Sequence, residues 1–197
     1  MPRSRYGSGS SRYCYAGTSI LINHYDIRND RQLQTMETIL ATQRLSELQE
    51  HPVSGDFDLR HLQKIHESIF KDLYPFAGEI RTENITKDGF TFAQSQFIRH
   101  AAGELFAKLL SENWDHMSKA ELAERLSYYM AEINVLHPFR EGNGRSLREF
   151  IRCIALEAEY VLDWAAVPNE EVLAASIESV HSCEHLQDVI HRSLREK

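Results

Sequence analysis

The stretch from His137 to Arg148 limits the fold of this chain more than any other. Its sequence is His-Pro-Phe-Arg-Glu-Gly-Asn-Gly-Arg-Ser-Leu-Arg. Pro138 has no backbone N–H and disfavours helical geometry in the residue before it, so a helix that arrives here must stop near Leu136. The two glycines allow a tight loop, and apolar residues then recur at helical spacing. The stretch therefore predicts two helices that meet at a short polar loop.

Apolar residues at three- and four-residue steps predict helices along most of the remaining chain. Side chains that can cap a helix precede several of these segments. The expected helices run from Asn29 or Asp30 to the residues before Pro52, from Asp58 to Leu73, from Phe97 to Leu110, from Ser118 to Leu136, from Arg145 to Ala158, from Asn169 to His181 and from Glu184 to Leu194.

Residues 80–92 predict a short β-hairpin, the only one expected in the chain. Isoleucine and threonine precede an Asp-Gly pair at Asp88 and Gly89, and phenylalanine and threonine follow it; the pair is a hairpin turn signal. A two-stranded hairpin is marginal in water, so we expect it to lie against helices. Its outer edge would keep unpaired backbone groups that could accept a partner strand.

Length and composition predict one domain of the all-α class. The chain has 197 residues, of which 42% are hydrophobic and 26% are charged, and this is enough for one sizeable core. Residues 1–12 are rich in Ser, Gly and Arg with little to bury, so we expect a flexible segment there. The single domain would then occupy residues 13–197.

Charge, hydropathy and cysteine content argue against several classes of protein. The net charge of -7 is unfavourable for direct nucleic-acid binding, which needs an excess of Lys and Arg. No apolar run is long enough for a membrane helix, and the N-terminus lacks an apolar signal core. Three widely separated cysteines do not indicate a disulfide framework. We therefore expect a soluble, unprocessed cytoplasmic protein.

The polar residues of the central loop together predict a polyphosphate site. A helix that begins after residues 142–144 directs backbone N–H groups and the positive end of its dipole at one spot. Arg145 and Arg148, three residues apart in its first turn, can grip separate phosphates. Glu141 offers a hard oxygen ligand for Mg²⁺, and His137 can accept a proton near neutral pH. Each residue alone also fits a turn or a surface position, but turn formation explains only the glycines.

The same stretch resembles a known family. Residues 137–148 match, without a substitution, the Fic family pattern H-x-F-x-[D/E]-G-N-G-R-x-x-R. The segment from Tyr13 to Ile27 is similar to the lead-in of bacterial toxin-type Fic proteins. The sequence Tyr-Pro-Phe-Ala-Gly-Glu-Ile-Arg at residues 74–81 resembles the approach to the flap of the family. The likeness covers most of the chain.

This resemblance implies a Fic fold, which is a helical bundle with one short β-hairpin flap beside the active-site loop. It also implies a protein adenylyltransferase that transfers AMP from MgATP to a Ser, Thr or Tyr hydroxyl of a target protein. By position in the motif, His137 would be the base, Phe139 a core anchor and Glu141 the Mg²⁺ ligand; Gly142, Asn143 and Gly144 would form the anion hole, and Arg145 and Arg148 would contact the β- and γ-phosphates. The flap that docks the target would comprise Arg81, Thr82, Glu83, Asn84, Ile85, Thr86, Lys87, Asp88, Gly89, Phe90, Thr91 and Phe92.

The resemblance leaves regulation open. Many family members carry an inhibitory helix with the pattern [S/T]-x-x-x-E-[G/N], whose glutamate pairs with the second arginine of the motif. Ser46 and Glu50 have the right spacing in this chain, but His51 follows. We therefore expect a separate small antitoxin that presents such a glutamate to Arg148. The alternative is an unregulated domain or an effector fragment, and an effector would be translocated into a host or recipient cell.

The transferred group also has alternatives. The chain could transfer a phosphoryl or another phosphate-linked group, although Gly144 stands where the phosphorylating branch of the family has lysine. It could also be a non-catalytic module that binds ATP. Two further histidines, His61 and His66 on the second predicted helix, are interpreted as packing or surface residues.

Overall fold

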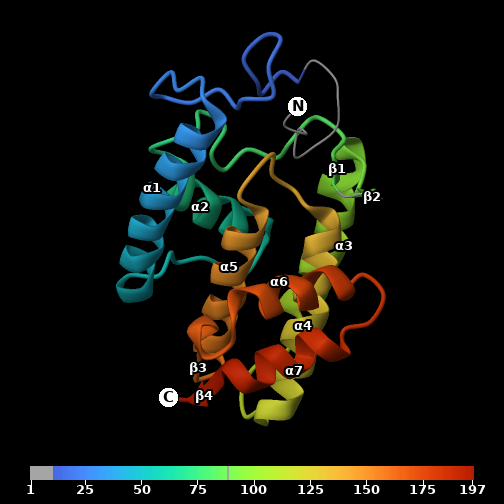
Figure 1. The fold of residues 1–197 in the computed structure, drawn as a ribbon. Coiled ribbons are helices and arrows are strands. Elements are labelled where there is room, and N and C mark those ends of the chain that lie inside the picture. Colours follow the sequence, from blue (N-terminus) through green and yellow to red (C-terminus); the bar gives the residue numbers. More distant parts are fainter. Residues whose placement is uncertain (1–10, 88) are drawn as a thin grey trace.

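The computed structural model describes residues 11–87 and 89–197, and this part of the chain is mainly helical (Figure 1). The prediction of an all-α fold is confirmed. Its helices are α1 (Asp30–Glu50), α2 (Leu59–Phe70), α3 (Ile98–Leu110), α4 (Lys119–Leu136), α5 (Asn143–Glu157), α6 (Asn169–Glu178) and α7 (Glu184–Ser193), with short 3-10 helices at Ser95–Phe97 and Trp164–Ala166. The strands are β1 (Thr86–Lys87), β2 (Phe90–Thr91), β3 (Tyr160–Leu162) and β4 (Leu194–Glu196).

Most of the predicted flexible segment (residues 1–10) and Asp88 of the predicted hairpin turn lie outside the described residues. None of the described helices is both long and apolar enough to cross a membrane.

Capping side chains fix where three helices begin, as the sequence predicts. Asn29 and Asp58 each accept the backbone N–H of the residue three positions on. Ser118 forms a reciprocal capping box with the third residue of α4, which satisfies two backbone donors at once. At α5 the start is two residues earlier than predicted, because Gly142 turns the chain with a φ of 78° and Asn143 is already helical.

A second strand pair corrects the prediction that the chain has only one β element. β3 and β4 pair antiparallel, with Leu162 opposite Leu194. The last helix therefore stops at Ser193, and Leu194 is buried from a strand instead. Because α6 and α7 lie between the two strands in sequence, no local turn signal marks their pairing. Similarly, α6 ends at Glu178 rather than at the predicted His181, where the chain turns toward α7.

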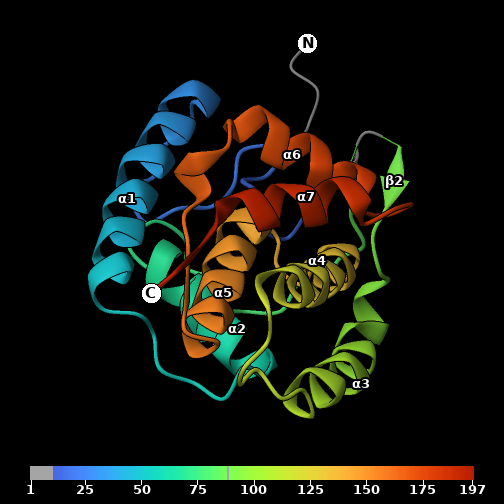
Figure 2. The same cartoon turned by 90° about the horizontal axis from the view of Figure 1, so that it is seen from below.

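The central helix of the bundle is α5. It packs against α2 and α4, and α7 packs across α4; Figure 2 shows α4 and α5 side by side with the other helices around them. Phe150, Ile151 and Ile154 of α5 are fully buried. One cluster of buried apolar side chains, which extends from Tyr13 to Leu194, joins these elements. The core therefore fixes the position of the polar loop that precedes α5.

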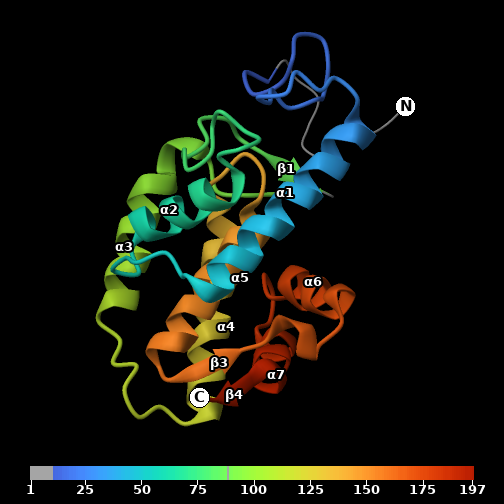
Figure 3. The ribbon, with the colours of Figure 1, turned by 90° about the vertical axis from the view of Figure 1, so that its left-hand side faces the viewer.

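The N-terminal segment, residues 11–29, has no helix and covers the end of the bundle near β1 (Figure 3). The side chain of Tyr13 is buried there. Ser11 Oγ donates to Glu83 Oε2 at 2.7 Å, and the N–H of Arg12 donates to Glu83 Oε1 at 2.6 Å. These anchored residues lie inside the segment that the sequence predicts to be flexible. The carboxylate of Glu83, far along the chain, supplies the contact that composition alone does not reveal.

A buried ion pair ties α1 to α5. Arg152 Nη2 lies 2.7 Å from Glu149 Oε1, and these side chains are only 6% and 2% exposed. The same guanidinium donates to the carbonyl of Leu48, near the end of α1, at 2.8 Å. A buried charge is tolerated only with such partners, since its loss of hydration is costly.

Removing the carboxylate of this pair should destabilise the whole fold. We expect Glu149→Ala to lower the free energy of unfolding by about 3–5 kcal/mol, because the substitution leaves a buried guanidinium without its counter-charge. Urea unfolding followed by circular dichroism measures the difference. Glu47→Ala is the matched control, since it removes the exposed partner of Arg44 on α1 and should leave the midpoint nearly unchanged. Equal midpoints for the two variants would contradict this account.

Candidate active site at the joint between α4 and α5

His137 ends α4 in a backbone conformation that is uncommon for a residue with a side chain. Its φ is 45°, in the left-handed region. Its N–H still bonds to the carbonyl of Ile133 at 3.1 Å, and its own carbonyl accepts the Nε–H of Arg81 at 2.8 Å. Strained conformations persist when surrounding contacts over-determine them. Here the hydrogen bonds of the N–H and of the carbonyl of His137 hold the residue in this conformation.

The imidazole of His137 has a defined tautomer and a low basicity. Nδ1 lies 3.2 Å from the carbonyl oxygen of Asn134, which can only accept, so Nδ1 carries the hydrogen and Nε2 has the basic lone pair. Burial is the largest effect and lowers the pKa of His137 to about 3; the Asn134 bond opposes it, and the charges of Arg81 and Lys87 reinforce it. The imidazole is therefore unprotonated at neutral pH, as a general base must be.

Asn143 fastens the loop between the two helices. Its side-chain oxygen accepts the N–H of Phe139, and its side-chain nitrogen donates to the carbonyl of the same residue, both at 2.8 Å. Phe139 is buried in the core. Because the amide side chain of Asn143 is engaged in this way, the groups that can face an anion at the start of α5 are the backbone N–H groups of Asn143 and Gly144.

The two glycines of the loop differ in what they require. A Cβ on Gly142 would lie 2.3 Å from the ring of Phe70, in addition to the positive φ of 78°. Gly144 is exposed, and the nearest atom to a Cβ there would be Nη1 of Arg148 at 3.9 Å. Glycine is therefore necessary at position 142 for the close approach of the loop to α2, whereas position 144 leaves the start of α5 accessible.

A buried histidine outside the motif holds the loop from α2. The N–H of Gly78 donates to Nδ1 of His66 at 2.8 Å, so Nε2 must carry the hydrogen that bonds to the carbonyl of Glu141, also at 2.8 Å. The imidazole stacks on the ring of Phe139, with 3.9 Å between centroids. Burial lowers the pKa of His66 to about 4. The sequence places His66 among packing residues, and nothing near it indicates a bond to a loop 75 residues away.

Arg145 and Arg148, the two arginines of the motif, lie close together on α5 in different surroundings. Arg145 Nη2 donates to Oε1 of Glu37 on α1 at 2.6 Å and lies 3.9 Å from Glu141 Oε1. Its guanidinium is 4.7 Å from the ring centroid of Phe70. Arg148 falls in the second turn, because α5 begins earlier than predicted, and burial followed by the charge of Arg145 lowers its pKa. Two cations near a helix N-terminus favour an anionic ligand.

The predicted hairpin forms, but its strands are only two residues long. Thr86 pairs with Thr91 across β1 and β2, and their hydroxyl oxygens are 3.1 Å apart. Just after β2, the ring of Phe92 stacks on the imidazole of His137, with 3.8 Å between centroids. The hairpin therefore touches the residue that the motif marks as the base.

Arg81 lies at the base of the hairpin with its side chain buried. Its Nη1 donates to the carbonyl of Glu83 and its Nη2 to that of Ala93, both at 2.6 Å. These carbonyls flank the hairpin on its two sides, and the Nε of the same guanidinium holds the carbonyl of His137. One side chain thus fixes both ends of the hairpin relative to the end of α4.

The predicted docking residues of the flap differ in exposure. Arg81 and Ile85 are buried; Glu83, Phe90 and Phe92 are half-buried; Thr82, Asn84, Thr86, Lys87, Gly89 and Thr91 are exposed; and Asp88 lies outside the described residues. The exposed group contains the side chains that an incoming protein could contact without a rearrangement.

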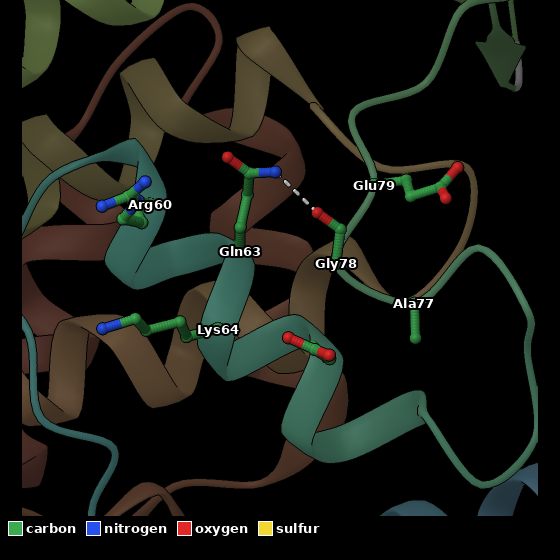
Figure 4. Close-up of a pocket in the computed structure, with 7 residues that line it drawn as sticks. Arg60, Gln63, Lys64, Ala77, Gly78 and Glu79 are labelled. Carbon is green, nitrogen blue, oxygen red and sulfur yellow. Dashed lines mark hydrogen bonds between the residues drawn. The ribbon is translucent and has the colours of Figure 1, made fainter.

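A pocket of about 480 Å³ lies between α2 and the turn formed by residues 77–79 (Figure 4). Gln63 donates to the carbonyl of Gly78 at 2.7 Å across it. Arg60, Lys64 and Glu67 complete the wall on α2. None of the residues of the central loop lines this pocket, so it is separate from the candidate active site.

Comparison with solved structures shows the class of fold, which is that of Fic domains. The N-terminal Fic domain of a VirB-translocated Bep effector protein from Bartonella quintana, solved with bound ADP, matches with a TM-score of 0.87 and 25% identity. The match covers 94% of this chain and 95% of that one.

Sequence comparison identifies the family. A model of the Fic/DOC family matches residues 56–155. Protein adenylyltransferase VbhT from Bartonella schoenbuchensis is 39% identical over 98% of this chain, which spans 41% of the length of that relative. Probable protein adenylyltransferase y4lH from Sinorhizobium fredii is 33% identical, over 89% of this chain and 91% of its own length. The chain belongs to the Fic/DOC family.

Two of the buried histidines, His66 and His137, predict that the fold loses stability in acid. Histidine in an unfolded chain has a pKa of about 6.5, whereas the pKa values in the folded state are about 4 for His66 and about 3 for His137. Below the unfolded value, the unfolded state binds more protons than the folded state, so the free energy of unfolding decreases as pH falls. We expect a decrease on the order of 1–2 kcal/mol per histidine between about pH 6.5 and about pH 5.

Urea unfolding at the two ends of this pH range measures the loss. His66→Gln should weaken the pH dependence, because glutamine does not titrate. His100→Gln is the control, since this histidine on α3 is 81% exposed, and it should leave the pH dependence as in the wild type. An undiminished dependence in His66→Gln would show that His66 is not held neutral by the fold.

Proposed function

We propose that this chain is a protein adenylyltransferase, which transfers AMP from MgATP to a Ser, Thr or Tyr hydroxyl of a target protein. The position of His137 is the observation that supports this proposal most directly. Its imidazole contacts the flap through Phe92, and its loop leads directly into the N-terminus of α5 with Arg145 and Arg148. The names of relatives at 39% and 33% identity support the same activity.

His137 takes the proton of the attacking hydroxyl in this mechanism. Since Nδ1 is bonded to the carbonyl of Asn134, the proton goes to Nε2 while the hydroxyl oxygen forms a bond to the α-phosphorus. The bond from that phosphorus to the oxygen that bridges to the β-phosphorus breaks, and pyrophosphate leaves. AMP is thereby esterified to the target. The negative charge of the bound nucleotide raises the pKa of the imidazole, which makes it a better base when substrate is present.

The start of α5 binds and orients the phosphates. The backbone N–H groups of Asn143 and Gly144 and the helix dipole favour the anion, while Arg145 contacts the β-phosphate and Arg148 the γ-phosphate. These groups are already in place on a helix whose other face is buried. Pre-arranged donors that neutralise the charge of the leaving pyrophosphate provide most of the rate enhancement in such a reaction.

Glu141 is the residue that would hold Mg²⁺. In the described part of the chain, no group of three or more His, Cys, Asp or Glu side chains could hold a metal ion. Mg²⁺ is commonly bound by one or two carboxylates together with substrate phosphates and water. The side chain of Glu141 is 11% exposed and lies 3.9 Å from Arg145, so a single carboxylate beside the phosphate site fits that mode. When bound, the ion neutralises and orients the phosphates.

The flap aligns the target segment. Exposed side chains at Thr86, Lys87 and Thr91 surround a hairpin of only two strands, whose outer edges have backbone groups able to pair. A target segment that adds as a further strand is aligned by backbone bonds, and its neighbouring side chains give selectivity. Because Phe92 contacts His137, a segment docked there brings its hydroxyl toward the base.

Labelled ATP tests the reaction. We expect MgATP labelled at the α-phosphate to modify protein in a cell lysate. His137→Ala should reduce this labelling by about 10²- to 10⁴-fold, which is the usual contribution of a general base, while ADP binding measured by calorimetry persists. His100→Ala is the matched control and should label as the wild type does. Label transferred from the γ-phosphate but not from the α-phosphate would refute AMP transfer.

We further propose that a separate antitoxin-like protein inhibits the enzyme in the cytoplasm of the producing cell. The chain lacks the pattern [S/T]-x-x-x-E-[G/N], and its nearest match ends at Glu50, an exposed residue in the last turn of α1. Arg148 is partly buried beside Arg145. A glutamate offered by a partner would pair with Arg148 and take the place of the γ-phosphate.

This regulation predicts a partner and a variant that weakens its binding. A short reading frame next to the gene should encode the missing pattern, and its purified product should bind the wild type. Arg148→Ala should raise the dissociation constant by about 10- to 100-fold, since a charge-assisted hydrogen bond contributes about 1.5–3 kcal/mol. Calorimetry measures this dissociation constant. Arg31→Ala, on the exposed surface of α1, is the control and should bind as the wild type does. Undiminished binding by Arg148→Ala would reject the glutamate clamp.

A further inference from the structure

Glu37 is a buried carboxylate that lies outside the motif and outside the part of the chain that the family model matches. It lies on the apolar face of α1, at helical spacing between the buried residues Leu33 and Ala41, and is 7% exposed. Its Oε1 accepts a hydrogen bond from Arg145 Nη2 at 2.6 Å, across 108 residues of sequence. A buried acid at an apolar-face position of a helix is uncommon unless it has a partner.

We propose that Glu37 is a positioning residue that fixes the guanidinium of Arg145 for the β-phosphate of the nucleotide. This inference rests on the proposed function, because that function assigns the β-phosphate to Arg145. It adds a residue from α1, which neither the sequence motif nor the flap contains, to the groups that determine nucleotide affinity.

Tyr74 holds the carboxylate from the other side. Its hydroxyl donates to Oε2 of Glu37, so each carboxylate oxygen has a defined partner. The ring of Tyr74 is buried and stacks on Phe76, with 4.9 Å between centroids. Burial and the carboxylate of Glu37 raise the pKa of Tyr74, so the phenol keeps the hydrogen that it donates. The orientation of Glu37 is therefore set by the core and does not depend on Arg145.

Phe70 supports the guanidinium from α2. The Cζ atom of Arg145 lies 4.7 Å from its ring centroid, which is within the range of a cation–π contact. The same ring approaches Gly142 so closely that a Cβ there would lie 2.3 Å away. Phe70 thus sets the position of the guanidinium relative to the loop that contains the other phosphate-binding groups.

The contact with Glu37 leaves part of the guanidinium for a ligand. Arginine has five N–H donors in a planar fork, and the bond to Glu37 uses the Nη2 end. The carboxylate reduces the net positive charge, which disfavours phosphate, but it also removes the freedom of a long side chain that is 22% exposed. It further offsets the repulsion between Arg145, Arg148 and the helix dipole. Because Tyr74 also holds Glu37, we expect the orientation of the guanidinium to be the larger effect.

Nucleotide affinities test this inference without a target protein. ADP and AMP compete against a fluorescent ATP analogue, in the presence of Mg²⁺, for wild type, Glu37→Ala, Glu37→Gln and Tyr74→Phe. We expect Glu37→Ala to weaken the affinity for ADP at least 10-fold. The affinity for AMP should change by less than 2-fold, because AMP has no β-phosphate. Glu37→Gln should recover most of the affinity, since its amide oxygen can accept from Nη2. Tyr74→Phe should weaken the affinity for ADP by a few fold and leave the affinity for AMP unchanged.

A double variant shows whether Glu37 acts through Arg145. In the Arg145→Ala background, Glu37→Ala should cause no further loss of ADP affinity. Equal losses for ADP and AMP, unchanged or tighter ADP binding, or an additive double variant would overturn the inference. If a thermal melt shows that Glu37→Ala does not fold, the Tyr74→Phe variant is the test instead. Unchanged ADP affinity in that variant would then contradict the inference. A wild-type protein that binds neither ADP nor ATP would instead reject the proposed function itself.

Discussion

The hydrogen bond from Arg81 to the carbonyl of His137 is the contact on which the geometry of the site depends. Without it, the left-handed residue at the end of α4 would lose a hydrogen bond to its backbone carbonyl. The same guanidinium binds the carbonyls of Glu83 and Ala93, so one side chain links the hairpin to His137. Hydrogen bonds from a charged donor are strong in a buried setting, which suits a contact that must keep two functional parts in register.

The loop between α4 and α5 is polar, yet most of its side chains are buried, and this affects their pKa values. Burial lowers the pKa values of His66 and His137 and keeps both neutral. His66 holds the loop by hydrogen bonds, and His137 is the proposed base. In the same region, Glu37 supplies a counter-charge to Arg145. In the proposed mechanism, an anionic nucleotide would meet fixed donors here, and its negative charge would raise the pKa of His137.

Local signals predicted most of the fold. Asn29, Asp58 and Ser118 cap the helices that their sequences indicate, because capping and apolar periodicity act within a few residues. The pairing of β3 with β4 was not predicted, since it joins segments on either side of two helices and has no turn of its own. The hairpin was predicted in the right place, but tertiary contacts of Arg81 and Phe92, rather than strand pairing, hold most of it in position.

The sequence by itself determined which groups the central loop brings together: an imidazole, a carboxylate, two arginines and two glycines, in an order that predicts a loop followed by a helix. Which other residues orient them was decided by the tertiary structure. Glu37, His66 and Tyr74 come from α1, α2 and the turn after α2, respectively, and their partners are far away in sequence. Side chains at an apolar helix face have the same local pattern whether they fill space or bond to a distant loop. Only the packing of α1 and α2 around α5 makes the difference.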